Sequence, residues 1–354
     1  SLRLVNLNAP YYIEYGIHET ENFSLSATLG ALNGVQKGRG RLPRIQVRVG
    51  DYQYDSGNYI YSDLPLAGRY DLGSCPIDDD YLALRRYFWL GTDAAYKSAL
   101  EALARKRAAQ KNLNLTEQLP DLLRIEPATL LLPWTRSSLD EEEWKTRVRR
   151  LSAVFAEYPS ILNSTVEFQH VQGQYYLVTS EGTRVRVPEG SAHFRIRASA
   201  LARDGMVLRD SVGFHALDLG GIPPEPVLRE AVQGVAANLS ALLNAPVGEA
   251  YTGPVLFEPV AAAQLLAETL GRSFVVRRRP VTEPGASIPF ANSEFEGRLG
   301  TRVLPDWIDV VDDPAAQEFA GRRLIGRYPV DLEGVAPKTV TLVEKGILRN
   351  FLTT

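Results

Sequence analysis

The stretch 254–270 is the first place to look for chemistry, because an apolar strand there turns directly into a helix. Glu258 is the ionisable residue directly before the helix, and a helix that starts there offers free main-chain N–H groups in a fixed direction. Pro259 suits the first helical turn, where its missing N–H costs nothing. Apolar residues follow at helical spacing, and we expect four of them to face a core: Val260, Leu265, Leu266 and Leu270.

The chemistry open to Glu258 depends on its neighbours. Beside a bound metal, its carboxylate can act as a general base on a metal-bound water. Without a metal, a carboxylate at the start of a helix stabilises the free N–H groups and the helix dipole by roughly 0.5–1 kcal/mol. We favour this structural interpretation.

Metal ligands are scarce in this chain. It has four histidines, and no two are close enough in sequence to form a short helical ligand pair: His18, His170, His193 and His215. His170 and His193 fall in or beside predicted strands, and we interpret them as cross-strand or surface residues. Cys75 is the only cysteine, so an internal disulfide and a cysteine-built metal site within one chain are excluded.

Charge does not indicate a nucleic-acid partner. The 354 residues carry a formal net charge of −3, with acidic and basic side chains interspersed. One predicted strand has a basic outer face, which we interpret as the solvated face of a sheet: Arg39, Arg41, Arg44 and Arg48. The acidic run Glu141–Glu143 is interpreted as charge that complements a helix N-terminus, in preference to a metal site.

The first 214 residues predict an α+β domain with antiparallel strands. A β meander is expected over 10–61, with strands at 11–15, 23–29, 44–49 and 59–61. Two helices are expected within 78–112, started by Asp78–Asp80 and separated at Gly91. After a loop over 119–136, a helix capped by Ser138 is expected over 139–158, with an apolar stripe of Trp144, Val148, Leu151 and Phe155.

A second set of strands is predicted over 161–212. Three pairs of residues predict the turns between them: Gln172-Gly173, Glu181-Gly182 and Asp204-Gly205. The Gly- and Pro-rich connector 215–226 is taken as a domain boundary, which gives an N-terminal domain over 1–214 and a C-terminal domain over 215–354. An apolar helix face after the connector is expected to pack across the junction: Leu228, Val232, Val235, Leu239 and Leu242.

The C-terminal half is predicted to be rich in strands, at 307–311, 324–330, 340–343 and 347–352. No nucleotide-binding loop, nucleophile elbow or cysteine-based zinc motif is present. No apolar run reaches the ~20 residues that span a bilayer. The single cysteine is compatible with a cytoplasmic location; because the chain begins at Ser1, an export signal before it is not excluded.

Several phrases of the C-terminal half resemble the TldD/PmbA family, the modulators of DNA gyrase that comprise metalloproteases and metal-free homologues. They are Gly253-Pro-Val-Leu-Phe-Glu, Glu296-Gly-Arg-Leu-Gly-Thr-Arg-Val-Leu-Pro, Ile308-Asp-Val-Val-Asp-Asp-Pro, Asp331-Leu-Glu-Gly-Val and Thr341-Leu-Val-Glu-Lys-Gly-Ile-Leu-Arg-Asn-Phe-Leu. Parts of the N-terminal half match more loosely. Family members usually continue for about a hundred residues beyond the position of Thr354, so the resemblance implies that the C-terminal domain is incomplete in this sequence. Two interpretations stay open: a longer natural chain, and a C-terminal sheet that lacks strands.

The resemblance also says what the step at 254–270 lacks. Active members carry His-Glu-x-x-x-His there, with two zinc-binding imidazoles and a glutamate base, and a late cysteine as third ligand. Those positions fall on Phe257, Glu258 and Ala262. Phenylalanine and alanine have no lone pairs for Zn²⁺, so we expect no zinc site here and interpret the step as a packed structural joint beside a peptide cleft. Glu258 and Arg298 are the candidate cleft residues.

The resemblance therefore implies a non-catalytic subunit of a peptide-degrading metalloprotease complex. Such a subunit pairs with a zinc-bearing TldD-like paralogue, or with a second copy of itself, and handles unfolded peptides in extended form. Two alternatives stay open: a non-enzymatic peptide-binding or assembly protein that reuses the scaffold, and an active zinc metallopeptidase with ligands elsewhere in the chain.

Overall fold

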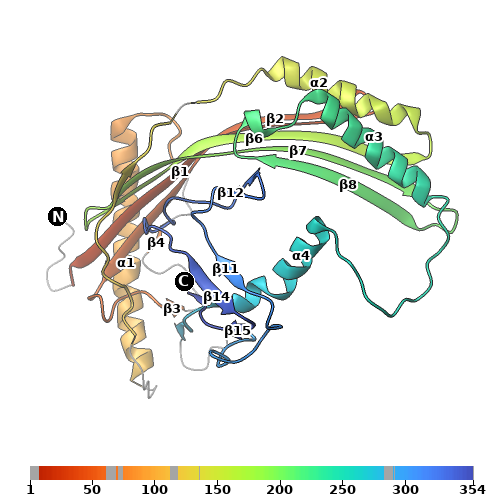
Figure 1. Cartoon of the computed structure of the whole chain (residues 1–354). Coiled ribbons are helices and arrows are strands. Elements are labelled where there is room, and N and C mark those ends of the chain that lie inside the picture. Colours follow the sequence, from red (N-terminus) through yellow and green to blue (C-terminus); the bar gives the residue numbers. More distant parts are fainter. Residues whose placement is uncertain are drawn as a thin grey trace.

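A long, curved antiparallel sheet dominates the computed structural model, which describes residues 8–60, 69–70, 75–111, 119–134, 136–282, 290 and 292–353 (Figure 1). Four of its strands run in the order β2, β1, β6, β7. Their bounds are β1 Pro10–Thr28, β2 Ala31–Val49, β6 Ile161–Thr179 and β7 Arg184–Leu201. Short β4 (Arg69–Tyr70) pairs with β2, while β5 (Thr129–Leu131) and β8 (Val207–Ala216) both pair with β7. The predicted α+β class with an antiparallel N-terminal sheet is confirmed.

The first two strands are longer than the strands predicted for the meander. β1 runs without a break from Pro10 to Thr28 and forms a hairpin with β2. The hairpin turns at Leu29 and Gly30, both with positive φ, which matches the twist of the two strands. The break predicted between the strands 11–15 and 23–29 is wrong. Polar residues in 16–22 continue the strand because they have partners across the hairpin; Glu19, for example, pairs with Arg39 and Arg41.

Gly173 was expected in a turn and instead lies in the middle of β6. A Cβ at this position would overlap the main-chain carbonyl oxygen of Glu19 on β1. The glycine therefore allows a close approach of two strands and does not end one. The turns at Glu181-Gly182 and Asp204-Gly205 are confirmed, with φ of 107° and 87° at the two glycines.

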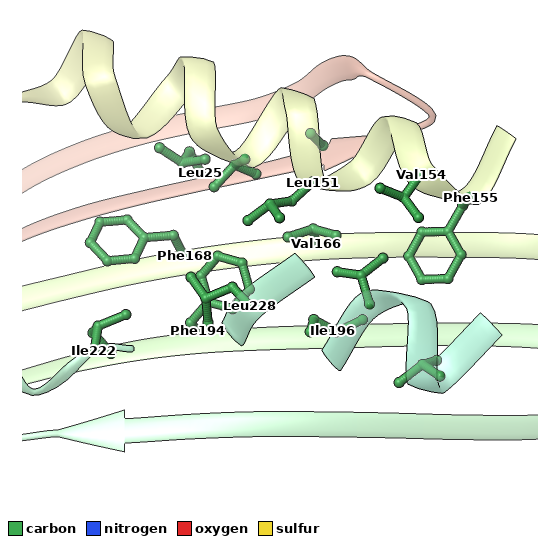
Figure 2. Close-up of a cluster of buried hydrophobic side chains, with 14 of the residues drawn as sticks. Leu25, Leu151, Val154, Phe155, Val166, Phe168, Phe194, Ile196, Ile222 and Leu228 are labelled. Carbon is green, nitrogen blue, oxygen red and sulfur yellow. The ribbon is translucent and has the colours of Figure 1, made fainter. Parts of the chain in front are cut away.

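Two helices cover one face of the sheet: α2 (Glu141–Ala153) and α3 (Glu225–Leu242). The predicted stripe of α2 is buried against the strands, and Trp144 stacks on Phe168 with ring centroids 3.7 Å apart. Figure 2 shows side chains of both helices meeting those of the strands in this core. Asp140, and not Ser138, caps α2 by accepting from the N–H of Glu143, and the last turn of the predicted helix is a 3₁₀ turn, Val154–Glu157.

Helix α1 (Tyr81–Gln110) is one helix, so the predicted break at Gly91 is wrong. Gly91 is buried where α1 crosses the sheet, and a Cβ there would overlap Ile45 and crowd Tyr70. The predicted start is confirmed, since Asp80 Oδ1 accepts from the N–H of Ala83 at 2.8 Å.

The elements around residue 215 bear on the domain boundary. His215 lies inside β8, and α3 packs into the same core as α2 through Leu228, Val232, Val235 and Leu239, whereas Leu242 is exposed. Helix α3 therefore shares the core of the sheet, and the exposed segment 244–258 follows it; the division at 215 stays a prediction.

The C-terminal part consists of short elements and lies on the side of the sheet opposite α2 and α3. After α4 (Pro259–Thr269), its strands are β9 (Val275–Val276), β10 (Val281–Thr282), β11 (Val310–Asp312), β12 (Glu318–Phe319), β13 (Arg322–Arg323), β14 (Val340–Glu344), β15 (Ile347–Leu348) and β16 (Leu352–Thr353). β14 pairs with β11 and β15 over a small core of Phe274, Phe295, Leu342, Val343 and Leu348. The strand predicted at 324–330 is wrong, because its residues form no ladder and Ile325 is half exposed.

One strand of the N-terminal part joins the C-terminal part. β3 (Tyr59–Ile60) pairs in parallel with β10, and Tyr59 is buried in a cluster with Ala102, Ala109 and Val281. Among the described residues, no helix is long and apolar enough to cross a membrane.

Candidate functional site

The step from Phe257 into α4 keeps the predicted helix and lacks the predicted strand. Residues 254–258 belong to no helix or strand, and α4 starts at Pro259. Glu258 holds the N-cap position through its main chain, because its carbonyl oxygen accepts from the N–H of Ala262 at 2.8 Å. Its side chain makes no capping hydrogen bond, so Glu258 contributes only its charge to the helix N-terminus.

The apolar residues at this step are exposed. α4 has no buried residue, and its one substantial contact among the described elements is the 3₁₀ turn Gly271–Phe274 that follows it. The exposed set is Val255, Leu256, Phe257, Val260, Leu265 and Leu266, with Leu256 96% exposed. The prediction of a packed joint is therefore wrong for this chain alone, although Leu270 does pack against the C-terminal core. We call these six residues the α4 face.

The positions that the resemblance assigns to zinc carry only carbon side chains. Phe257 precedes the helix, and Ala262 follows one turn into it. In the part of the chain that the structure describes, no three histidine, cysteine, aspartate or glutamate side chains gather to form a metal centre.

Arg298 does not meet Glu258. Its guanidinium lies over the ring of Phe295, 5.7 Å from the centroid, and its carbonyl oxygen accepts from Thr301 Oγ1 at 2.7 Å. Asp313 Oδ1 accepts from the N–H of Ala315 and from Thr339 Oγ1, both at 3.2 Å. The family phrases around these residues thus fix loops in this structure.

Two arginines of the basic strand, Arg41 and Arg48, do not lie on a solvated face. Arg41 is 9% exposed and pairs with Glu19 and Asp79. Arg48 Nη1 lies 2.9 Å from Asp55 Oδ2, where the carboxylate raises the pKa of the guanidinium against the lowering effect of burial. Because carboxylates neutralise these two arginines, the arginines create no positive potential that would attract a polyanion such as a nucleic acid.

Sequence reasoning missed a polar seam where the C-terminal part meets the open face of the sheet. The main-chain carbonyl oxygen of Leu332 accepts a hydrogen bond from Tyr175 Oη at 2.5 Å and another from the guanidinium of Arg44. Arg44 also pairs with buried Glu14, 2.6 Å away. Burial raises the pKa of the Tyr175 hydroxyl to about 12. It also raises the pKa of the Glu333 carboxyl, to which Glu14 and Asp331 add.

The histidines have three different settings. His170 is buried with Nε2 3.2 Å from Ser137 Oγ, and burial lowers its pKa. His18 lies 3.1 Å from Glu189 and stacks on Tyr175. His193 and His215 face one another across β7 and β8, with their Nδ1 atoms 2.5 Å apart. The sequence signal for this pair was the Asp204-Gly205 turn, since equal steps outward from Asp204 reach both histidines.

Comparison with known sequences agrees with the resemblance. Residues 250–354 match the profile of the PmbA/TldA metallopeptidase C-terminal domain. A protein named metalloprotease from Methanothermobacter thermautotrophicus is 23% identical over 202 residues, which are 56% of this chain and 40% of that protein. A second metalloprotease, from Archaeoglobus fulgidus, is 36% identical over 58 residues, 16% of this chain and 12% of its own length. The matches thus cover less than half of either relative.

Solved structures show the same fold. A protein from Thermotoga maritima described as a modulator of a DNA gyrase superposes with a TM-score of 0.61 at 15% identity, covering 97% of this chain and 67% of its own. TldE from Thermococcus kodakarensis superposes with a TM-score of 0.54 at 14% identity, with the same coverage. These likenesses extend over both the long sheet and the C-terminal part.

Proposed function

Because the chain belongs to the TldD/PmbA family, we propose that it is a non-catalytic subunit of a peptide-degrading metalloprotease complex. The observation that carries this proposal is the chemistry of Phe257 and Ala262, which stand where active members place two imidazoles. Neither side chain has a lone pair, and Zn²⁺ in catalytic sites is held by nitrogen, sulfur or oxygen ligands. Glu258 then has no metal-bound water to deprotonate.

The catalytic zinc is supplied, in this proposal, by a paralogue that carries His-Glu-x-x-x-His. The α4 face supports such a partnership, because it gathers six large apolar side chains on one exposed segment. A group of large exposed apolar side chains is typical of protein interfaces. The face includes Phe257 and adjoins Glu258 in the chain, so a partner seated on it covers the degenerate site.

Unfolded peptides are the proposed substrates of the complex. Glu258 is exposed, and its carboxylate makes no capping hydrogen bond, which leaves it able to accept from main-chain N–H groups of a bound peptide. Arg298 is exposed as well and supplies a guanidinium donor in the C-terminal part. A cytoplasmic location stays a prediction.

The direct experiment mixes this chain with the zinc-bearing paralogue and measures hydrolysis of an unfolded peptide. We expect cleavage only in the mixture, and a stable complex in size-exclusion chromatography. A paralogue whose glutamate base is replaced by glutamine is the control, and its mixture should form the complex without cleavage.

Other outcomes separate the alternatives. Hydrolysis by this chain alone, abolished by chelation and restored by zinc, contradicts the proposal and supports a metallopeptidase with ligands elsewhere. Absence of both complex and cleavage contradicts a partner subunit. A complex that binds peptide without cleaving it, even with an intact paralogue, favours the non-enzymatic binding protein.

A further inference from the structure

A polar row crosses five strands on the open face of the sheet, opposite the face that α2 and α3 cover. The register places Gln36, Ser24, Gln169, His193 and His215 side by side on β2, β1, β6, β7 and β8. All five line one hollow of about 410 Å³. Residues of the N-terminal part line the hollow, and the proposed function does not use it.

The two imidazoles at the end of this row converge. Their Nδ1 atoms are 2.5 Å apart, and the ring planes cross at 78°. Gly213 precedes His215 on the same face of β8, and a Cβ there would lie 3.2 Å from His215 Nε2. The missing side chain thus gives the His215 ring room to lie over the strand and direct Nδ1 at His193.

Two Nδ1 atoms that face each other need a proton or a cation between them, because otherwise their lone pairs repel each other. A shared proton satisfies the pair in one way. A metal ion satisfies it in another, since it accepts both lone pairs. With Zn–N bonds of ~2.0–2.1 Å, two nitrogens of a tetrahedral site lie about 3.3 Å apart. Small rotations of the two side chains open the observed gap to that value.

We propose that His193 and His215 form a two-imidazole site for a late first-row divalent metal ion: Zn²⁺, Ni²⁺ or Cu²⁺. Imidazole nitrogen suits these ions better than Mg²⁺ or Ca²⁺, which prefer oxygen. Gln169 adjoins His193 in the row and offers a side-chain carbonyl oxygen or a hydrogen bond to a bound water. The remaining coordination positions of the metal ion face the hollow, where water can occupy them.

Charged side chains of both signs lie near the pair. Arg195 lines the same hollow and opposes a cation, while Glu167, its neighbour in the register, adds a negative charge and pairs with Arg197. Burial, His215 and Arg195 together lower the pKa of His193.

The test is a titration of the tag-free, chelator-treated full chain with NiCl₂ or ZnSO₄, followed by calorimetry. We expect one ion per chain, and at least about tenfold weaker binding for His193→Ala and for His215→Ala. Copper gives the structural readout, because electron paramagnetic resonance of bound Cu²⁺ should show coupling to two imidazole nitrogens in the wild type and to fewer in either variant.

His18→Gln is the matched control, since it removes a histidine from the same chain without touching the pair, and it should bind as the wild type does. Circular dichroism confirms that all variants are folded. Equal binding by the wild type and His193→Ala, or no binding at millimolar metal, overturns the site.

Discussion

Lys106 Nζ lies 2.5 Å from Asp121 Oδ2, and both side chains are 1% exposed. Asp121 also accepts from the N–H of Asp55 at 2.8 Å and from Arg278 Nη1 at 3.0 Å. One carboxylate thus holds α1, the segment after β2 and the C-terminal part together. Burial lowers the pKa of Lys106 against the raising effect of Asp121, so this cation depends on its partner.

We therefore predict that Asp121→Ala lowers the free energy of unfolding by about 3–5 kcal/mol, because it leaves a buried cation unpaired. Lys97→Met is the control: Lys97 is 62% exposed in an i,i+4 pair with Asp93, and the change should cost under about 1 kcal/mol. Urea unfolding measures both. A cost for Asp121→Ala no larger than that of the control contradicts the role given to this pair.

Two helical glycines should respond to alanine in opposite directions. Gly234→Ala in α3 places its methyl group in open space, and we expect about 0.5–1 kcal/mol of stabilisation from helix propensity. Gly91→Ala in α1 gains the same propensity but overlaps Ile45, and overpacking costs ~1–3 kcal/mol. We expect net destabilisation at Gly91 in thermal unfolding. Stabilisation by both changes would show that α1 does not lie against the sheet as described.

Stability should fall as the pH drops below about 6.5, the ordinary pKa of histidine. Burial lowers the pKa of His170, and burial with His215 and Arg195 lowers that of His193. Between 6.5 and the lowered values the unfolded chain binds protons that the folded chain does not, so buried His170 removes up to ~1.4 kcal/mol per pH unit and the more exposed His193 removes less. Urea midpoints from pH 7.5 to 5 measure this slope.

His170→Gln should make the slope shallower, and adding His193→Gln should make it shallower again. A slope that neither change alters would assign the acid sensitivity to other groups.

The double variant Val260→Ser/Leu266→Ser tests the α4 face. Both side chains are exposed, 83% and 53%, so the unfolding free energy should change by under about 0.5 kcal/mol. Association with the paralogue, or self-association, should weaken markedly in sedimentation velocity. Leu239→Ser, at a fully buried position, is the contrast and should destabilise the fold. Unchanged association with a stable fold would show that partners bind elsewhere.

Local pattern was enough to predict much of the fold. The stripe from Trp144 to Phe155 predicted the buried face of α2, and Glu181-Gly182 and Asp204-Gly205 predicted two real turns. Gly91 and Gly173 were misread because a glycine that admits a neighbouring chain looks the same in sequence as one that ends an element. Only the packed partner, Ile45 or Glu19, distinguishes the two.

The candidate site was also predicted only in part, because local sequence does not show contacts between distant segments. The start of α4 at Pro259 follows from local sequence. Periodicity gives the apolar face of α4 but does not say what covers it, so its exposure was missed. The seam at Leu332 and the pair of His193 with His215 depend on strand register and on contacts between distant segments.

The pairing of β1 with β6 sets the order in which this chain can fold. Ala27 meets Val166 and Glu14 meets Thr179, so the centre of the sheet joins two strands far apart along the chain. The β1–β2 hairpin is local and can form early during synthesis, whereas its inner edge stays open until β6 is made. Contacts of such high sequence separation fold slowly, and an unpaired strand edge attracts other chains meanwhile. We expect refolding yield to depend on protein concentration through this interval.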